Sequence, residues 1–260
     1  MKPIFRRRRE RTGIYVLAIM LVLMGLLGFM VYQAFKPKES YSMSRSTAEN
    51  KAAIIDGLSE DLPNPKLITE MKKYLESAGY EVVVFNGSSV NLELFKKLPK
   101  MSFSLIIMRL HGGRIRQPIG LYIGSGIFVE PFNEEKYTYE YYSGYLLKGV
   151  AYIRGKEYFV ITPHYVLDKL EGRFPGTKII VLSCYSMWDE IMAKAFIKRG
   201  ASIFVGIDKK VDSSYLDKVG LELVKEISQG HDVKEAVSSI MERIGPDPIS
   251  GARLLYYTKD

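Results

Sequence analysis

The chain has 260 residues, which is long enough for one sizeable domain with a hydrophobic core in addition to a membrane anchor. Its 47% hydrophobic and 25% charged residues are ordinary for a folded protein and argue against extended disorder. The net charge of +8 lies mostly in residues 1–12, which contribute +5, so it does not predict a nucleic-acid partner. A single cysteine excludes an internal disulfide, and no Cys/His cluster has the spacing of a zinc site, so neither a metal nor another cofactor is expected.

The first 50 residues are expected to form a membrane anchor and a linker. Residues 14–35 carry no charged side chain, and roughly 20 apolar residues suffice to cross a ~30 Å hydrocarbon core, so this segment predicts one transmembrane helix. The basic tail of residues 1–13 predicts a cytoplasmic N-terminus, with a polar linker over 36–50 and a domain over 51–260 outside the cytoplasm. A cleaved signal peptide is the alternative, but no small-residue cleavage site follows the apolar segment.

From residue 51 onward, short apolar runs alternate with amphipathic stretches, the pattern of βα units and a mainly parallel sheet. We expect strands over residues 52–55, 81–85, 104–110, 178–183, 202–206 and 252–257. Helices are expected over residues 68–78, 92–98, 163–170, 188–199, 215–228 and 233–244. In the helix of residues 188–199, the side chains expected to face inward are those of Ile191, Met192, Ala195 and Phe196.

The segment of residues 114–177 interrupts this pattern and is rich in tyrosine. Seven tyrosines fall between residues 137 and 158, and runs of Tyr and Val broken by Gly predict one or two β-hairpins appended to the main sheet. Two interpretations stay open, a substrate-recognition surface and a set of tyrosines that only covers the fold. Composition does not decide between them.

Two of the expected strands each end on a reactive side chain. The strand of residues 104–110 is followed by His111 and two glycines, and the strand of residues 178–183 by Cys184. Because ligands gather at the carboxyl ends of parallel strands, both groups are expected at one edge of the sheet. An imidazole with a pKa of ~6.5 can take the proton of a thiol near neutral pH and make it a nucleophile. The alternative is an inert core cysteine, against which the polar and glycine residues on either side argue.

The order of these motifs resembles that of the clan CD, or caspase-like, cysteine peptidases, nearest to the CHAT and gingipain-type domains. The resemblance rests on His111-Gly112, then Leu182-Ser183-Cys184, a helix, and the segment of residues 200–206, and it covers roughly residues 52–244. It implies a three-layer α/β/α caspase-like fold with residues 114–177 as an insertion. It also implies a cysteine endopeptidase whose partners are peptide or protein substrates, and the predicted anchor of residues 14–35 would hold this enzyme at a membrane.

The resemblance implies roles for individual residues as well. Cys184 would attack the scissile carbonyl, and His111 would act as acid and base. The backbone N–H groups of Gly112 and Cys184 would form the oxyanion hole.

Substrate preference is less well indicated. Metacaspase-like members carry an acidic residue two positions before the cysteine, where this chain has Leu182, so that position does not support a preference for basic substrates. The residues that would line a basic-selective pocket are Asp189, Asp208 and Asp212, with helix capping or solvent exposure as the alternative. Conversely, the residues that would bind an acidic substrate group are Arg114 and Arg116, with a position on the surface and no ligand as the alternative.

Two other functions remain open. The first is a catalytically inactive caspase-like module that binds a partner at the membrane. The second, a flavodoxin-like nucleotide binder, is weaker because no GxGxxG motif opens a helix. His164 and His231 follow no core strand and are interpreted as surface imidazoles.

Overall fold

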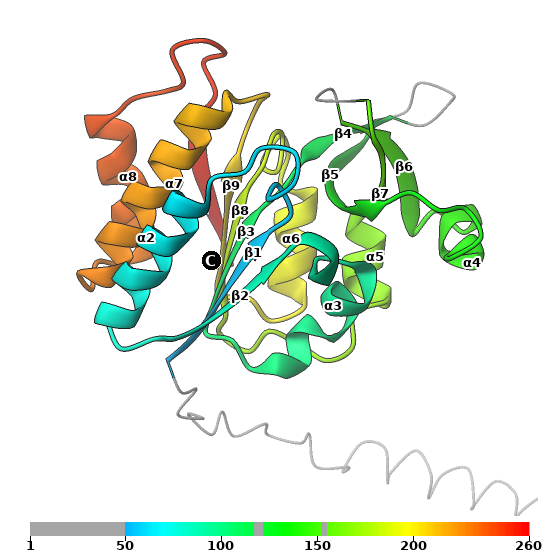
Figure 1. The fold of residues 1–260 in the computed structure, drawn as a ribbon, viewed down its shortest axis with the longest axis horizontal. Coiled ribbons are helices and arrows are strands. Elements are labelled where there is room, and N and C mark those ends of the chain that lie inside the picture. Colours follow the sequence, from blue (N-terminus) through cyan, green and yellow to red (C-terminus); the bar gives the residue numbers. More distant parts are fainter. Residues whose placement is uncertain (1–49, 117–121, 152–154, 260) are drawn as a thin grey trace, which may run out of the picture. The chain divides into compact units, whose positions relative to one another are not determined.

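The computed structural model describes residues 50–116, 122–151 and 155–259 (Figure 1). They belong to one of two compact units of the chain, Thr47–Asp260. The expected tail, anchor and nearly all of the linker lie outside the described residues. Within the described ranges, no helix combines the length and apolar composition that a membrane span requires.

The main sheet, sheet A, has six strands in the order β10-β9-β8-β3-β1-β2. Its parallel strands are β1 (Lys51–Asp56), β2 (Glu81–Asn86), β3 (Leu105–Arg109), β8 (Lys178–Leu182) and β9 (Ile203–Ile207). The strand β10 (Leu254–Thr258) pairs antiparallel with β9 at one edge. The expectation of a mainly parallel sheet is confirmed, and each of these strands begins and ends within two residues of its expected position.

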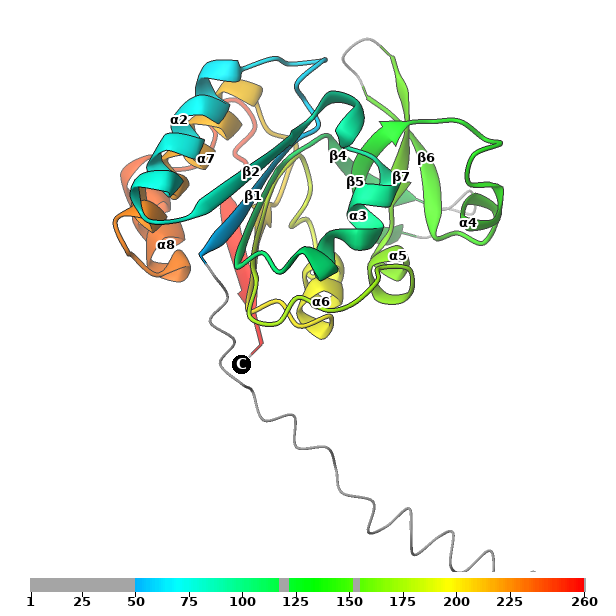
Figure 2. The same cartoon turned by 60° about the horizontal axis from the view of Figure 1, so that its bottom comes forward.

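Helices cover both faces of sheet A (Figures 1 and 2). One face packs against α2 (Pro65–Ser77), α7 (Ser213–Ser228) and α8 (Val233–Arg243). The other packs against α3 (Leu92–Lys97), α5 (Pro163–Asp168) and α6 (Ile191–Lys198). Two short 3₁₀ turns, η1 (Gly87–Ser89) and η2 (Leu98–Met101), flank α3. The arrangement has the three α/β/α layers that the sequence predicts.

Alternation along the strands divides the core between the two faces. In β3, Ile106 and Met108 pack toward α3 and α6, whereas Leu105 and Ile107 pack toward α2 and α7. All five residues of β3 are buried because helices cover both faces, which explains the continuous apolar run in the sequence. Burial of each apolar side chain of β3 stabilises the fold by about 1.5–3 kcal/mol.

Helix α6 differs from the expected helix of residues 188–199. It begins at Ile191, where the backbone N–H donates to the Asp189 carboxylate at 3.0 Å. Ile191 is 46% exposed, so the prediction that it faces inward is wrong. The other three side chains expected to face inward, Met192, Ala195 and Phe196, are buried.

The tyrosine-rich insertion forms a sheet of its own, sheet B, in the order β4-β5-β7-β6. Its strands are β4 (Gly112–Arg116), β5 (Tyr122–Pro131), β6 (Leu146–Val150) and β7 (Glu157–Ile161), all antiparallel, with the short helix α4 (Thr138–Tyr142) between β5 and β6. The prediction of hairpins is confirmed, but the prediction that they extend the main sheet is wrong. Since β3 is already paired on both sides, by β1 and β8, the chain that leaves it finds no free edge of sheet A beside it.

Candidate functional site

The carboxyl ends of β3 and β8 bring the segments that carry His111 and Cys184 together. The two strands are parallel neighbours, and beyond them the N–H of Leu110 donates to the carbonyl of Leu182 at 3.1 Å. Gly112 then lies directly against Cys184, since a Cβ atom at Gly112 would be 2.3 Å from the Cys184 carbonyl oxygen. The backbone that follows the histidine and the backbone of the cysteine are therefore in contact at one edge of sheet A.

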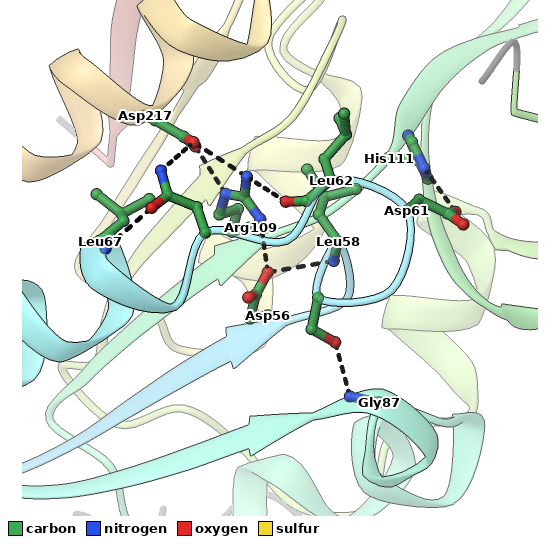
Figure 3. A network of polar contacts seen from close by, with 11 residues as sticks. Asp56, Leu58, Asp61, Leu62, Leu67, Gly87, Arg109, His111 and Asp217 are labelled. Atoms are coloured by element: carbon green, nitrogen blue, oxygen red, sulfur yellow. Dashed lines mark hydrogen bonds and ion pairs between the residues drawn. The ribbon is translucent and has the colours of Figure 1, made fainter.

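The imidazole of His111 is held by a carboxylate that the sequence did not single out. Its Nε2 lies 3.1 Å from Oδ2 of Asp61, in the segment between β1 and α2 (Figure 3). The ring also packs against Tyr158 and Phe128, with centroid distances of 5.7 and 6.3 Å. Burial lowers the pKa of His111, and the hydrogen bond and charge of Asp61 oppose that effect only in part. The imidazole is therefore neutral near neutral pH in this conformation.

Asp61 is itself a buried and well-bound group. Its carboxylate accepts a short hydrogen bond from the Tyr158 hydroxyl and forms an ion pair with Lys156, whose Nζ is 3.1 Å from Oδ1. Burial alone would raise the pKa of Asp61, but the hydrogen bonds from Tyr158, Lys156 and His111 outweigh burial and lower it. The carboxylate stays charged and can fix the orientation of the imidazole.

The thiol of Cys184 points to another part of the chain. Its Sγ accepts a hydrogen bond from the N–H of Val211 at 3.5 Å and lies 3.8 Å from the Val211 carbonyl oxygen. Burial raises the pKa of Cys184, although the Val211 N–H and the charge of Lys210 act in the opposite direction. Across the ranges that the structure describes, no hydrogen bond joins this sulfur to His111. The thiol is protonated in this conformation.

The turn after Cys184 is anchored on three sides. The N–H of Tyr185 donates to the Lys209 carbonyl at 2.9 Å, and its own carbonyl accepts a hydrogen bond of 2.6 Å from the buried Ser125 hydroxyl. Tyr185 has φ of +58°, a conformation that non-glycine residues rarely adopt. The buried Ser186 hydroxyl donates to Val181 and accepts from Ile207. This anchoring fixes the backbone on either side of the cysteine.

The three aspartates predicted to line a substrate pocket each accept backbone N–H groups. Asp189 accepts from Ile191, Asp208 from Arg253 at 2.7 Å, and Asp212 caps α7 by accepting from Ser214 and Tyr215. These contacts match the capping alternative, and a role in substrate binding stays a prediction. Of the two arginines, Arg114 lies beside the turn after Cys184, and the side chain of Arg116 is outside the described part.

The other two histidines lie in α5 and in the segment between α7 and α8. His164 is exposed, in the first turn of α5, and His231 is exposed and within hydrogen-bond distance of Glu226. Among the described residues, no cluster of three or more His, Cys, Asp or Glu side chains could hold a metal ion.

A buried ion network beside the site was also missed (Figure 3). Arg109, only 1% exposed, donates to Asp56 at 2.9 Å and to Asp217 at 2.7 and 3.0 Å. It also donates to the Leu62 carbonyl, next to Asp61. The sequence gave a weak indication of this network, because Asp56 and Arg109 are charged residues at the ends of largely apolar strands. Nothing in the sequence distinguished Asp217 from the other charged residues of its helix. The network holds in place the segment that carries Asp61.

Comparisons with known proteins give a distant likeness among solved structures. No protein family model matches the sequence, and no curated protein matches it either. Among solved structures, the chain is similar to gingipain R, an Arg-specific cysteine proteinase, with a TM-score of 0.47 and 10% sequence identity. The match covers 75% of this chain and 43% of that one, so this chain spans less than half of the gingipain structure.

Proposed function

We propose that this chain is a caspase-like cysteine peptidase in which Cys184 is the nucleophile and His111 the general acid and base. One observation carries the proposal: the backbone after β3 meets the backbone after β8, with Gly112 against the carbonyl of Cys184. A thiol and an imidazole whose backbones meet at one sheet edge are the two groups that thiol-based hydrolysis requires.

The proposed reaction runs in two stages. The thiol gives its proton to the imidazole, and the sulfur attacks the carbonyl carbon of the substrate, while the oxygen receives hydrogen bonds from the N–H groups of Gly112 and Cys184. The imidazolium then protonates the leaving amine, which departs and leaves a thioester. Water, deprotonated by the imidazole, hydrolyses the thioester to a carboxylate, and the thiol regains its proton.

The reaction requires two changes from the arrangement described above. The sulfur must leave the N–H of Val211, and the imidazole must present a nitrogen to it. Catalytic hydrogen bonds often form only when substrate is bound, so these changes are assigned to substrate binding. Asp61 acts through the imidazole and is a positioning residue, because its hydrogen bond to Nε2 leaves the other ring nitrogen available.

We also propose that residues 14–35 anchor the domain to a membrane, with residues 1–13 in the cytoplasm. The support is the uncharged apolar segment and the basic cluster before it. Protease treatment of intact and permeabilised cells tests the orientation. Digestion of the domain in intact cells supports it, and protection until permeabilisation contradicts it.

The peptidase proposal is tested with Cys184→Ala, His111→Gln and the matched control His164→Gln, an exposed imidazole. A peptide library analysed by mass spectrometry should show cleavage by the wild type and by His164→Gln. Cys184→Ala and His111→Gln should show none. Cleavage that persists in Cys184→Ala would exclude this nucleophile. Because Cys184 is the only cysteine, labelling by iodoacetamide reports on that sulfur alone.

A second candidate function is a catalytically inactive caspase-like module that binds a partner. It is favoured by the thiol, whose pKa is raised and whose sulfur is bound to Val211. The two candidates separate in the same experiment. If no peptide of the library is cleaved while the purified full-length chain retains its fold by circular dichroism, the binding module is the better account.

A further inference from the structure

The surface next to Cys184 holds an arginine against two aromatic rings. The Cζ atom of Arg114 lies 4.9 Å from the ring centroid of Tyr185 and 4.8 Å from that of Trp188. The two rings contact each other edge to face, with centroids 5.8 Å apart. Tyr185 directly follows Cys184, and Arg114 lies two residues after Gly112, so this cluster adjoins the proposed nucleophile.

The fold holds this cluster in place. Arg114 is in β4 and pairs with Ser125 of β5, and the hydroxyl of Ser125 donates to the Tyr185 carbonyl at 2.6 Å. The positive φ of Tyr185 turns the chain here, and Lys209 accepts the Tyr185 N–H. A guanidinium held against two rings loses less conformational entropy when it binds a ligand than an arginine that is free in solvent.

The guanidinium has its hydrogen-bond donors available. Arg114 is exposed, and among the described residues no group accepts a hydrogen bond from it or forms an ion pair with it. The contacts with the two rings are cation–π contacts and not hydrogen bonds, so they leave the N–H groups of the guanidinium available. This fork of donors fits the two oxygens of a carboxylate.

Both positive and negative side chains lie near the cysteine. Lys209 and Lys210 lie in the segment that contacts Cys184 and Tyr185, and the charge of Lys210 reaches the thiol. The nearest carboxylate along the chain, Asp189, accepts the N–H of Ile191 at the start of α6. Asp208 and Asp212 flank these two lysines, and the charge of Asp247 also acts on the thiol, so the local charge is mixed and the preference for a carboxylate rests on Arg114 itself.

We propose that Arg114, held against Tyr185 and Trp188, binds a carboxylate of the peptide substrate beside the bond that Cys184 attacks. The inference rests on the proposed function and names its substrate class, an acidic peptide. The carboxylate is either an Asp or Glu side chain or a free C-terminus. A pocket lined by Asp189, Asp208 and Asp212 would instead select a basic substrate.

Trp188 makes the test direct, because it is the only tryptophan of the chain and lies in the cluster itself. The full-length Cys184→Ala variant in detergent is titrated with short peptides that are otherwise uncharged and carry a single Asp, Asn or Lys. The position of this residue differs from one peptide to the next. Each peptide is made with an amidated and with a free C-terminus. Trp188 fluorescence should report saturable binding with a half-saturation concentration about 10-fold or more lower for a carboxylate peptide than for its amide counterpart.

Substitution of the arginine supplies the control. In the Cys184→Ala background, Arg114→Gln should abolish the preference for the carboxylate peptide. Arg173→Gln, which removes an arginine before the opposite, amino-terminal end of β8, should keep it. Equal binding of Asp and Asn peptides, tighter binding of Lys peptides, a preference that survives Arg114→Gln, or no saturable change with any peptide would each overturn the inference. Comparison of the peptides with free and amidated C-termini shows whether Arg114 binds a C-terminal carboxylate or an acidic side chain.

The wild-type chain separates this inference from the peptidase proposal. If it binds carboxylate peptides selectively but cleaves none, the peptidase proposal fails and the acidic site stands. If it cleaves peptides with no acidic preference, the acidic site alone fails.

Discussion

Oδ2 of Asp61 lies 3.1 Å from Nε2 of His111, although 50 positions separate the two residues in the chain. The same carboxylate is bound by Tyr158 of β7, in sheet B, and by Lys156, which directly precedes β7. The imidazole is thus oriented by a group from the first βα connection, which is fixed in turn by the insertion.

Asp61→Asn should lower the pKa of His111 further. Burial already lowers this pKa, and the hydrogen bond and charge of Asp61 are what oppose it. Titration of the His111 ring by NMR, assigned with the His111→Gln variant, checks the expectation. Glu60→Gln is the matched control, since it removes the neighbouring carboxylate, whose side chain is 64% exposed. An unchanged His111 pKa in Asp61→Asn would remove the positioning role.

Alkylation of Cys184 should be slow at pH 7 and should accelerate as the pH rises. Iodoacetamide reacts with the thiolate, and burial raises the pKa of this thiol, so the inflection should lie above the ordinary value of 9.0. Stopped-flow or timed quenching with mass spectrometry gives the rate at each pH. The same profile is then measured with an acidic peptide bound at Arg114. An inflection at lower pH than in the free chain would show that the sulfur leaves the N–H of Val211 when substrate binds. A free chain with an inflection well below 9.0 would contradict the arrangement described here.

Gly112→Ala should abolish hydrolysis and destabilise the fold by about 1–3 kcal/mol, the usual cost of overpacking a tightly packed position. The added Cβ would lie 2.3 Å from the Cys184 carbonyl oxygen, so the two backbone segments must separate. Gly113→Ala is the control, because its Cβ would approach a side chain, the Phe128 ring, at 3.3 Å. Chemical denaturation and the peptide assay measure both variants. Equal effects of the two substitutions would argue against the close backbone contact.

Arg109→Met should destabilise the domain by about 3–5 kcal/mol, because it leaves Asp56 and Asp217 without their buried cation. Burial raises the pKa of Asp56, so this loss should shrink on acidification as the carboxyl group takes up a proton. Urea denaturation at several pH values gives the free energies of unfolding. Arg173→Met, at an exposed position, should change stability little. A small effect of Arg109→Met would mean that the network does not support the segment carrying Asp61.

Local patterns were enough to predict the strands of sheet A. The inner strands are short runs whose alternate side chains fill two different cores, as Ile106 and Ile107 do, and a run buried on both faces is visible without knowledge of its neighbours. The start of α6 was harder, because the helical spacing of Trp188 and Ile191 continues past the true boundary. The Asp189 carboxylate, which receives the Ile191 N–H, sets that boundary.

The sequence by itself determined the layered α/β domain and the two strands that end in His111 and Cys184, because periodicity and strand ends are local properties. Only the tertiary structure decided what these side chains touch. Asp61 meets the imidazole, Val211 binds the sulfur 27 positions away, and Arg109 joins Asp217 across 108 positions. Such contacts depend on the path that long connecting segments take through space, and many different paths are compatible with the same local sequence pattern. Sheet B is separate from sheet A for the same reason, since the pairing of β3 on both sides is a property of the whole fold.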